Sequence, residues 1–186
     1  MKLLLGSNSP RRKELLQNLG FPLNVVSIEC EEIFPENMPI ENIAGYLSEL
    51  KANAFGLLEK DEVLLTADTV VAIGNHVLGK PKNEAEATKM LQMLAGKTHQ
   101  VYTGITFRTL EKTITQTDVA QVTFSEITPE EINFYVKNYH PFDKAGSYGI
   151  QEWLGMAKTT KIDGSFYTIM GLPTHLVYET LKDFGF

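Results

Sequence analysis

The sequence predicts an α/β protein with an elongated, mixed β-sheet flanked by helices, and three observations carry this prediction. A short apolar run at residues 3–5 leads through a polar turn into a segment of good helix formers. Residues 63–73 are almost continuously apolar, which is typical of a central strand buried on both faces. Residues 98–108 and 113–124 are rich in β-branched side chains and flank a short polar turn, which indicates a long antiparallel hairpin. We therefore expect both parallel and antiparallel strand pairs in one sheet.

The first half of the chain continues this alternation of strands and helices. Ser9 suits the N-cap of the first helix, Pro10 its first position and Gly20 its end. Residues 21–28 predict a strand, and an acidic loop follows them. The next predicted helix is amphipathic, and its apolar positions are Ile43, Tyr46, Leu47, Leu50, Ala54 and Leu57.

The remaining elements are marked by turn and capping residues. Residues 74–75 predict a turn, after which residues 77–78 return beside the central strand. Asn83 suits the cap of a helix that ends near Gly96. Residues 128–131 have the pattern of a capping box, with a helix expected as far as Asn138.

A hairpin and a closing helix are expected near the end of the chain. Residues 163–164 are an Asp-Gly turn signal, which predicts a hairpin between two further strands. The segment from Gly171 leads into a closing helix through Leu176, Val177 and Leu181. There is no repeat or clear linker, so residues 1–186 are expected to form a single domain.

Composition narrows the classes of protein to consider. The chain has 43% hydrophobic and 22% charged residues, which is ordinary for a globular protein. Its net charge of −6 argues against a general nucleic-acid or membrane surface. Cys30 is the single cysteine, which excludes a disulfide framework and a thiolate metal cluster. Neither a signal peptide nor a membrane span is evident, so a cytoplasmic location is expected.

A basic turn opens the first predicted helix. Ser9 and Pro10 would bring Arg11 and Arg12 into the first helical turn, among unpaired N–H groups and the positive end of the helix dipole. Cations are destabilised there unless an anion binds among them, so the turn predicts a phosphate cradle. A solvated basic turn is the alternative.

Asp68 is the outstanding carboxylate, because it lies within the apolar run at residues 63–73. An ionised carboxylate in a buried strand is costly unless it meets a cation, a metal or several donors. Placements of this kind indicate function. The alternative is an aspartate at a bulge that accepts hydrogen bonds from nearby backbone amides.

Other polar residues carry weaker signals. Glu31 and Glu32 could hold a hard divalent cation through oxygen ligands, or could form a solvated acidic pair. Lys51 lies on the long predicted helix, and Lys80 follows Gly79, which lets a backbone approach a ligand closely. An ordinary surface position is the alternative for both lysines.

Residues 141–151 form the densest group of polar and glycine residues. An ion-pairable Asp143–Lys144 couple precedes two glycines, and Tyr148 could pack a flat ligand or fill the core. Gln151 offers one acceptor and two donors to the edge of a base. An ordinary loop is the alternative, and the four histidines lack ligand spacing and are interpreted as structural.

Several motifs occur along the chain in this order: Ser7-x-Ser9-Pro10-Arg11-Arg12, Ala67-Asp68-Thr69-Val70-Val71, Gly79-Lys80-Pro81, Thr98-His99-x-Val101, Asp143-Lys144-Ala145-Gly146-x-Tyr148-x-Ile150-Gln151 and Gly171-Leu172-Pro173. This ordered set resembles the Maf family of nucleoside triphosphate pyrophosphatases, and the resemblance covers essentially the whole chain. The resemblance implies a fold like that of inosine triphosphate pyrophosphatases, with two lobes around a cleft. It also implies cleavage between the α- and β-phosphates, with a divalent metal, Mg²⁺ or Mn²⁺, as cofactor.

The resemblance further assigns roles to individual residues. Asp68 corresponds to the proton acceptor, and a role as metal ligand stays open for it. Arg11, Thr69 and Gln151 correspond to positions tied to substrate choice. The positions that line the phosphate and metal site are Ser9, Arg12, Lys51, Lys80 and, by a looser match, Glu32.

The stretch from Asp143 to Gln151 is similar to the branch of the family that acts on dTTP and UTP, which implies that Lys144 also lies among the substrate-binding positions. Gln151 suits the imide face of thymine or uracil. One departure is Glu152-Trp153 after Gln151, where a glycine is more usual in the family, so the shape of this loop and the base selectivity are open questions.

The sequence leaves a competing function class. A nucleotide- or nucleic-acid-binding regulator of cell division would bind without turnover, whereas the net charge and Asp68 favour a hydrolase. A phosphotransferase lacks an evident second-substrate site. The partner expected is a nucleoside triphosphate, with no nucleic acid and no membrane. A homodimer through apolar residues of the long hairpin is also considered.

Overall fold

A computed structural model describes all 186 residues of the chain and divides them into two compact units. Unit 1 consists of Met1–Asp68, Thr103–Asp118 and Gly171–Phe186. Unit 2 consists of Thr69–Tyr102 and Val119–Met170. The chain therefore enters unit 1 three times, and each unit is described by itself below.

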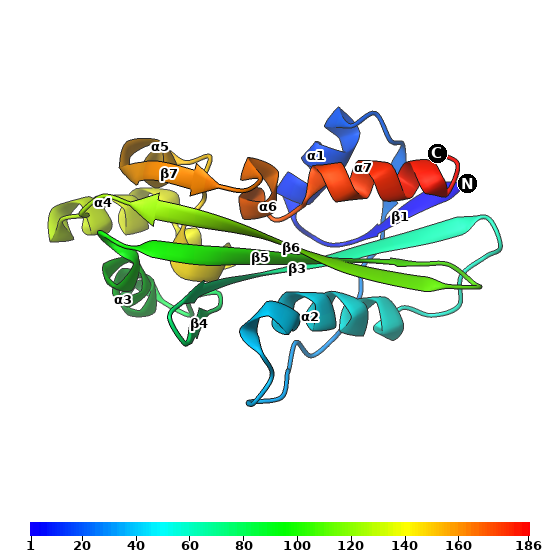
Figure 1. Cartoon of the computed structure of the whole chain (residues 1–186), viewed down its shortest axis with the longest axis horizontal. Helices are drawn as coiled ribbons and strands as arrows, with labels where there is room; N and C mark the ends of the chain where they lie inside the picture. Colours follow the sequence, from blue (N-terminus) through cyan, green and yellow to red (C-terminus); the bar gives the residue numbers. More distant parts are fainter. The chain divides into compact units, whose positions relative to one another are not determined.

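Seven strands form one mixed sheet in the order β2-β1-β3-β5-β6-β7, with β4 paired to β3 (Figure 1). The strands are β1 (Lys2–Gly6), β2 (Leu23–Val25), β3 (Glu62–Ile73), β4 (His76–Leu78), β5 (Thr98–Arg108), β6 (Thr113–Phe124) and β7 (Thr159–Asp163). β2 and β3 both run parallel to β1, whereas β4 is antiparallel to β3 and β7 is antiparallel to β6. The predicted mixed α/β sheet is confirmed, as are the bounds of the two long strands β5 and β6.

In unit 1, helices α1 (Pro10–Asn18) and α7 (Thr174–Asp183) lie on one side of the strands and α2 (Ile40–Ala54) lies on the other (Figure 1). Gly104 lets α2 approach the sheet closely, because a Cβ at this position would lie 2.3 Å from the Ala44 carbonyl carbon. Ser48 on the same helix shares a hydrogen bond of 2.7 Å with the Thr106 hydroxyl. These contacts fix α2 against β5.

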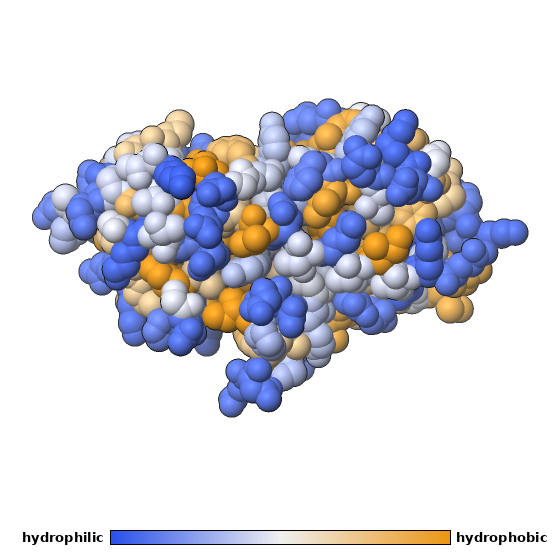
Figure 2. All heavy atoms as spheres, in the orientation of Figure 1, coloured by the Kyte–Doolittle hydropathy of each residue, from blue (hydrophilic) through white to orange (hydrophobic).

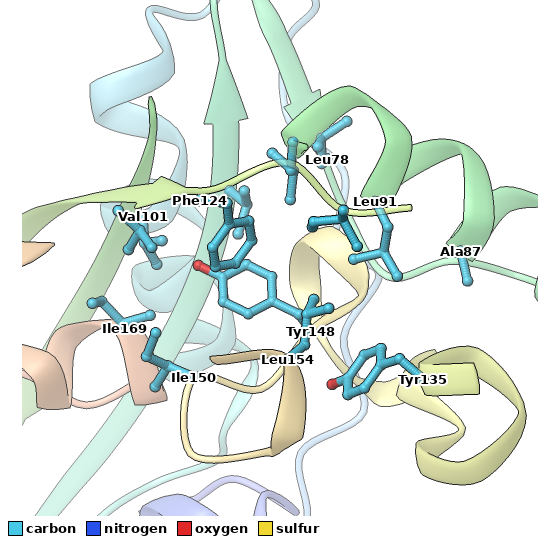
Figure 3. Close-up of a cluster of buried hydrophobic side chains, with 14 of the residues drawn as sticks. Leu78, Ala87, Leu91, Val101, Phe124, Tyr135, Tyr148, Ile150, Leu154 and Ile169 are labelled. Carbon is cyan, nitrogen blue, oxygen red and sulfur yellow. The ribbon is translucent and has the colours of Figure 1, made fainter. Parts of the chain in front are cut away.

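Unit 2 is built around one apolar cluster (Figure 3). Its helices are α3 (Glu84–Leu94), α4 (Pro129–Tyr139), the 3-10 turns η1 (Pro141–Asp143) and η2 (Ala145–Ser147), α5 (Trp153–Lys158) and α6 (Phe166–Met170). Tyr148 lies among the apolar side chains and packs edge-on against Phe124, with ring centroids 4.9 Å apart. The capping box that begins α4 is present, since the Thr128 hydroxyl accepts from Glu131 N and the Glu131 carboxylate accepts from Thr128 N.

Two elements are shorter than the sequence predicts. The strand expected over residues 21–28 is limited to β2 at Leu23–Val25, after which only Val26 N still bonds to the Leu5 carbonyl, at 2.9 Å. The second helix ends at Ala54 instead of continuing to Leu57, which is 95% exposed. Arg108 on β5 donates to the carbonyl of Ala52, at 2.5 Å, and so satisfies a group that a longer helix would use.

The segment after residue 164 was predicted to be a strand, and this prediction is wrong. Residues 166–170 form helix α6, because the Ser165 carbonyl accepts from Thr168 N and Ile169 N. The segment is rich in aromatic and β-branched residues, so the structure here overrides their strand preference. The helix α5 was not predicted either, since six residues are too few to show a helical period.

The molecular face in Figure 2 is largely hydrophilic, with small separated apolar spots. This agrees with the charged-residue content of 22%. None of the helices combines the length and the apolarity needed to span a membrane.

Candidate active site

The predicted site residues of unit 1 gather where the parallel pairing of three neighbouring strands ends: loops follow β1 and β2, whereas β3 continues past this edge. The pairing of β1 with β3 ends at Gly6 and Thr66, so Asp68 follows two residues beyond the last pair. The loop after β1 leads into α1, and the loop after β2 carries Glu32. Ligands of open α/β sheets bind at this edge, so the topology itself indicates a site here.

Asp68, Lys51 and Glu32 form an ion-paired group. Lys51 Nζ lies 2.5 Å from Asp68 Oδ1 and 3.0 Å from Glu32 Oε1. Asp68 is 7% exposed, and the exposed fraction of the Glu32 side chain is 43%. Lys51 is thus the cation that the buried carboxylate requires, and the alternative of an aspartate held by backbone amides alone is wrong.

Arg12 joins this group from the first turn of α1. Its Nε donates to the Gly171 carbonyl at 2.7 Å and its Nη1 donates to the Ser7 hydroxyl at 3.2 Å. Burial is the main cause that lowers the pKa of Arg12, with a smaller contribution in the same direction from Arg11, while the Asp68 and Glu32 charges raise it. The guanidinium is therefore within electrostatic reach of both carboxylates.

The first turn of α1 has the predicted residues but not the predicted cap. Ser9 occupies the N-cap and Pro10 the first position, yet the Ser9 side chain accepts no capping hydrogen bond. The Ser7 hydroxyl instead accepts from Ser9 N at 3.3 Å. Arg11 and Arg12, which are both half-buried, stand in the first turn of the helix as expected, and no acidic residue accompanies them there.

In unit 2, two of the predicted motifs are brought together. Gly146 N donates to the Gly79 carbonyl at 3.1 Å, so the segment of Lys80 adjoins the segment that begins at Lys144. Gly146 adopts a φ of 69°, which suits glycine alone without strain. Lys80 is exposed, and Thr69, the residue after Asp68 on β3, is half-buried.

Lys144 and Gln151 differ in their surroundings. Lys144 is buried, and its Nζ lies 2.8 Å from Asp143 Oδ1 and 3.1 Å from Glu152 Oε1. Gln151 is exposed, although residues 146–150 before it are all buried. Its amide is therefore free of the core and available to a ligand.

Sequence reasoning missed Glu152, Tyr135 and Ser7. Glu152 was regarded only as a departure from the family pattern, but its carboxylate contacts both Lys144 and the Tyr135 hydroxyl. Of the two roles left open for Tyr148, the structure supports the core, because the ring is buried and its hydroxyl contacts His99. No local pattern in the sequence marks Tyr135, which comes from a different helix.

Glu32 and Asp68 are the carboxylates of unit 1 that could offer oxygen ligands to a divalent cation. Glu32 and Asp68 both direct a carboxylate oxygen at the Lys51 ammonium, so the position between them accommodates positive charge. No group of three His, Cys, Asp or Glu side chains able to hold a metal occurs. Two carboxylates fit Mg²⁺, which keeps waters and takes its remaining ligands from phosphate oxygens.

Comparison with known proteins gives consistent results. The model of the family described as "Maf-like protein" matches residues 2–184 of the chain. A dTTP/UTP pyrophosphatase of Porphyromonas gingivalis is 45% identical, covering 99% of this chain and 94% of its own. A protein of the same name from Flavobacterium psychrophilum is 47% identical, covering 100% and 95%, respectively.

Solved structures agree with the fold. The chain is similar to a HAM1 protein from Coxiella burnetii, with a TM-score of 0.56 and 11% identity over 98% of this chain and 99% of that one. The Ham1 protein of Staphylococcus aureus gives a TM-score of 0.54 and 14% identity over the same shares. Because the family match and the relatives both run through nearly the whole sequence, the chain belongs to the Maf family.

Proposed function

We propose that this protein hydrolyses dTTP and UTP to the nucleoside monophosphate and pyrophosphate. The observation that carries the proposal is the buried Asp68 carboxylate, ion-paired with Lys51 beside Glu32 and Arg12. The relatives named dTTP/UTP pyrophosphatase, which are 43–47% identical, support it. Residues 1–186 act as one functional domain in this proposal, and the continuous family match from residue 2 to residue 184 supports that.

The reaction is an attack of water on the α-phosphorus. A bond forms from the water oxygen to phosphorus, the bond to the oxygen that bridges the α- and β-phosphates breaks, and pyrophosphate leaves with that oxygen. In our proposal Asp68 accepts the proton of the attacking water, as a general base does. Arg11, Arg12 and Lys80 bind the phosphates and stabilise the charge on the leaving group, since phosphoryl transfer depends mainly on positioning and charge.

A divalent cation is part of the proposal. Glu32 and Asp68 would hold it, and it would supply charge neutralisation for the triphosphate. Lys51 occupies the position between these carboxylates, so its ammonium holds them in place before a substrate binds. The carboxylate set supports Mg²⁺ or Mn²⁺ rather than a softer metal.

Base choice is proposed to depend on Gln151, Arg11 and Thr69. The exposed amide of Gln151 can donate to a carbonyl and accept from the N3–H of uracil or thymine. Cytosine presents an amino group and an unprotonated N3 instead, which reverses that pattern. Discrimination against CTP is therefore the expected signature of this side chain.

The test is pyrophosphate release from dTTP, UTP, CTP, GTP and 7-methyl-GTP with Mg²⁺ or Mn²⁺, repeated with a chelator. We expect release from dTTP and UTP that stops on chelation and returns with added metal. Pyrophosphate release only from triphosphates with other bases would support the proposed reaction but contradict the proposed preference for dTTP and UTP. Binding without any release would contradict the enzyme and favour a nucleotide-binding regulator.

Asp68→Asn is expected to lower kcat at least about a hundredfold, because the amide cannot accept the proton. Steady-state kinetics measures the loss, and circular dichroism checks the fold. Asp61→Asn is the matched control, since Asp61 pairs with Lys2 at 3.2 Å on the exposed surface of the same unit. Equal activity of the Asp68 variant and its control would remove Asp68 from the mechanism.

A homodimer and a cytoplasmic location stay predictions. The hairpin of β5 and β6 exposes apolar side chains, among them Leu110 and Val119, which a dimer contact would use. Light scattering coupled to size-exclusion chromatography measures the oligomeric state directly.

A further inference from the structure

We propose that Glu152 and Tyr135 are positioning residues for base recognition, which fix the turn that presents Gln151. The inference rests on the proposed function, because it assigns a role in the substrate choice of that same site. Neither residue is expected to touch the nucleotide. Their role is to hold the backbone on both sides of Gln151.

The hydrogen bonds form a closed group within unit 2. The Tyr135 hydroxyl donates to Glu152 Oε2 and accepts from Gly149 N at 3.0 Å. Glu152 Oε1 lies 3.1 Å from Lys144 Nζ. Gln151 lies between Gly149 and Glu152 in the sequence, so both flanks of this exposed residue are tied to one phenol.

Packing leaves this turn little room to move. A Cβ on Gly149 would lie 2.8 Å from Glu152 Cδ, and a Cβ on Gly155 would lie 2.0 Å from the Ile150 carbonyl oxygen. Glycine is therefore required at the second position, because the obstructing atom there is backbone. The exposed side chain of Gln151 is thus carried by a closely packed turn.

Tyr135 is itself held rigidly. Its ring is fully buried in the cluster of Figure 3 and stacks on Tyr139, with centroids 4.9 Å apart and planes 22° from parallel. Burial, and then the hydrogen bond to Glu152, raise the pKa of Tyr135, so the hydroxyl keeps its proton and remains a donor. A neutral donor is what the Glu152 carboxylate requires on its second oxygen, since the first faces Lys144.

Gln151 can discriminate between bases only if its donor and acceptor meet the base edge in a fixed orientation. A site that reads a base by hydrogen bonds loses selectivity when those groups shift, because the correct and incorrect edges are then bound almost equally. Loss of the Tyr135–Glu152 contact should therefore reduce the preference for UTP over CTP. A purely structural role would lower the amount of folded enzyme and affect both substrates equally.

The experiment compares Tyr135→Phe and Glu152→Gln with wild type, by the ratio of kcat/KM for UTP to kcat/KM for CTP. This ratio does not depend on the fraction of enzyme that is folded. We expect it to fall about tenfold in each variant, which is the effect of about one misplaced hydrogen bond. Glu152→Gln keeps the side-chain volume, so it tests the inference even if Tyr135→Phe is poorly folded.

Two controls match these changes. Tyr139→Phe removes a phenol from the same helix, one turn away, and keeps the stacked ring pair. Glu131→Gln removes a carboxylate that pairs with Lys158 at 2.6 Å in the same unit. Both controls are expected to keep the wild-type ratio, although Glu131→Gln should lower stability.

The outcomes separate the two proposals. A wild-type ratio in both Tyr135→Phe and Glu152→Gln, with turnover retained, would overturn this inference and leave the proposed function intact. A reduced ratio in the controls to the same extent would also overturn it. No pyrophosphate release from wild-type protein would overturn the proposed function and the inference with it.

Discussion

His99 is a buried titratable residue that takes no part in the proposed chemistry. Its Nε2 lies 2.7 Å from the Tyr148 hydroxyl, whereas its buried Nδ1 has no hydrogen-bond partner. Burial lowers the pKa of His99 to about 4 from its ordinary 6.5. The unfolded chain therefore binds a proton between these pH values that the native protein does not bind, and the free energy of unfolding falls as the pH is lowered.

The contribution of His99 can be measured by denaturant unfolding at pH 7.5 and pH 5. We expect wild type to lose about 2 kcal/mol more than His99→Gln between these two values, because the variant cannot take up the proton. The exposed His76, His140 and His175 are common to both proteins and cancel. An equal loss in both would show that His99 does not control this part of the pH profile.

The site residues differ in how far their roles can be inferred from the neighbouring sequence. Asp68 could be predicted because a carboxylate within an apolar strand needs a partner, and the structure supplies Lys51. That partner, 17 positions away in the sequence, could not be predicted as such. Tyr135 and Glu152 could not be predicted as a pair either, since their contact depends on the packing of α4 against the turn.

At the scale of elements, helices and strands were predicted correctly where several local sequence signals agreed. The capping box and the proline at its first position agree for α4, and its predicted end lies within one residue of Tyr139. Prediction failed where one signal stood alone: the Asp-Gly turn at residues 163–164 leads into helix α6, and β7 pairs with β6 instead of with a following strand. The short helix α5 and the turns η1 and η2 carry no periodic signal.

The capping box of α4 gives a prediction at this scale. Thr128→Ala removes the hydroxyl that accepts from Glu131 N, and we expect it to lower the free energy of unfolding by about 1 kcal/mol. For a protein of this size that corresponds to a fall in Tm of about 2–4 °C. Thr128→Ser keeps the acceptor and should retain most of the stability. Equal losses in both variants would mean that the methyl group, and not the cap, matters.

For the whole molecule, the net charge of −6 makes a different kind of prediction. The chain has 17 Lys and Arg residues against 23 Asp and Glu residues, so a general basic surface is not expected. We expect no retention of duplex DNA in a filter-binding assay at physiological ionic strength, because polynucleotide binding requires many phosphate contacts. Tight, salt-sensitive retention would instead support the alternative function, a nucleic-acid-binding regulator.

The fold class was predictable from the sequence because strand and helix periods alternate along nearly the whole chain. The order of the strands could not be predicted, because no local sequence pattern indicates that β3 pairs with β1 on one side and with β5 on the other. The division into units follows from that order: β3, β5 and β6 each contribute residues to both. A site made of the loops after β1 and β2 and of Asp68 within β3 could be recognised only once the parallel pairing of these strands was known.

The three separate segments of unit 1 bear on how the chain folds as it is made. Phe21 packs against Tyr178 and Phe186, with ring centroids 5.9 and 6.2 Å away, and Arg12 donates to the Gly171 carbonyl. On the ribosome, these early residues emerge well before their partners, and all of unit 2 is translated in between. The apolar surface of the first strands and helix therefore stays incompletely covered until the last segment, Gly171–Phe186, leaves the exit tunnel.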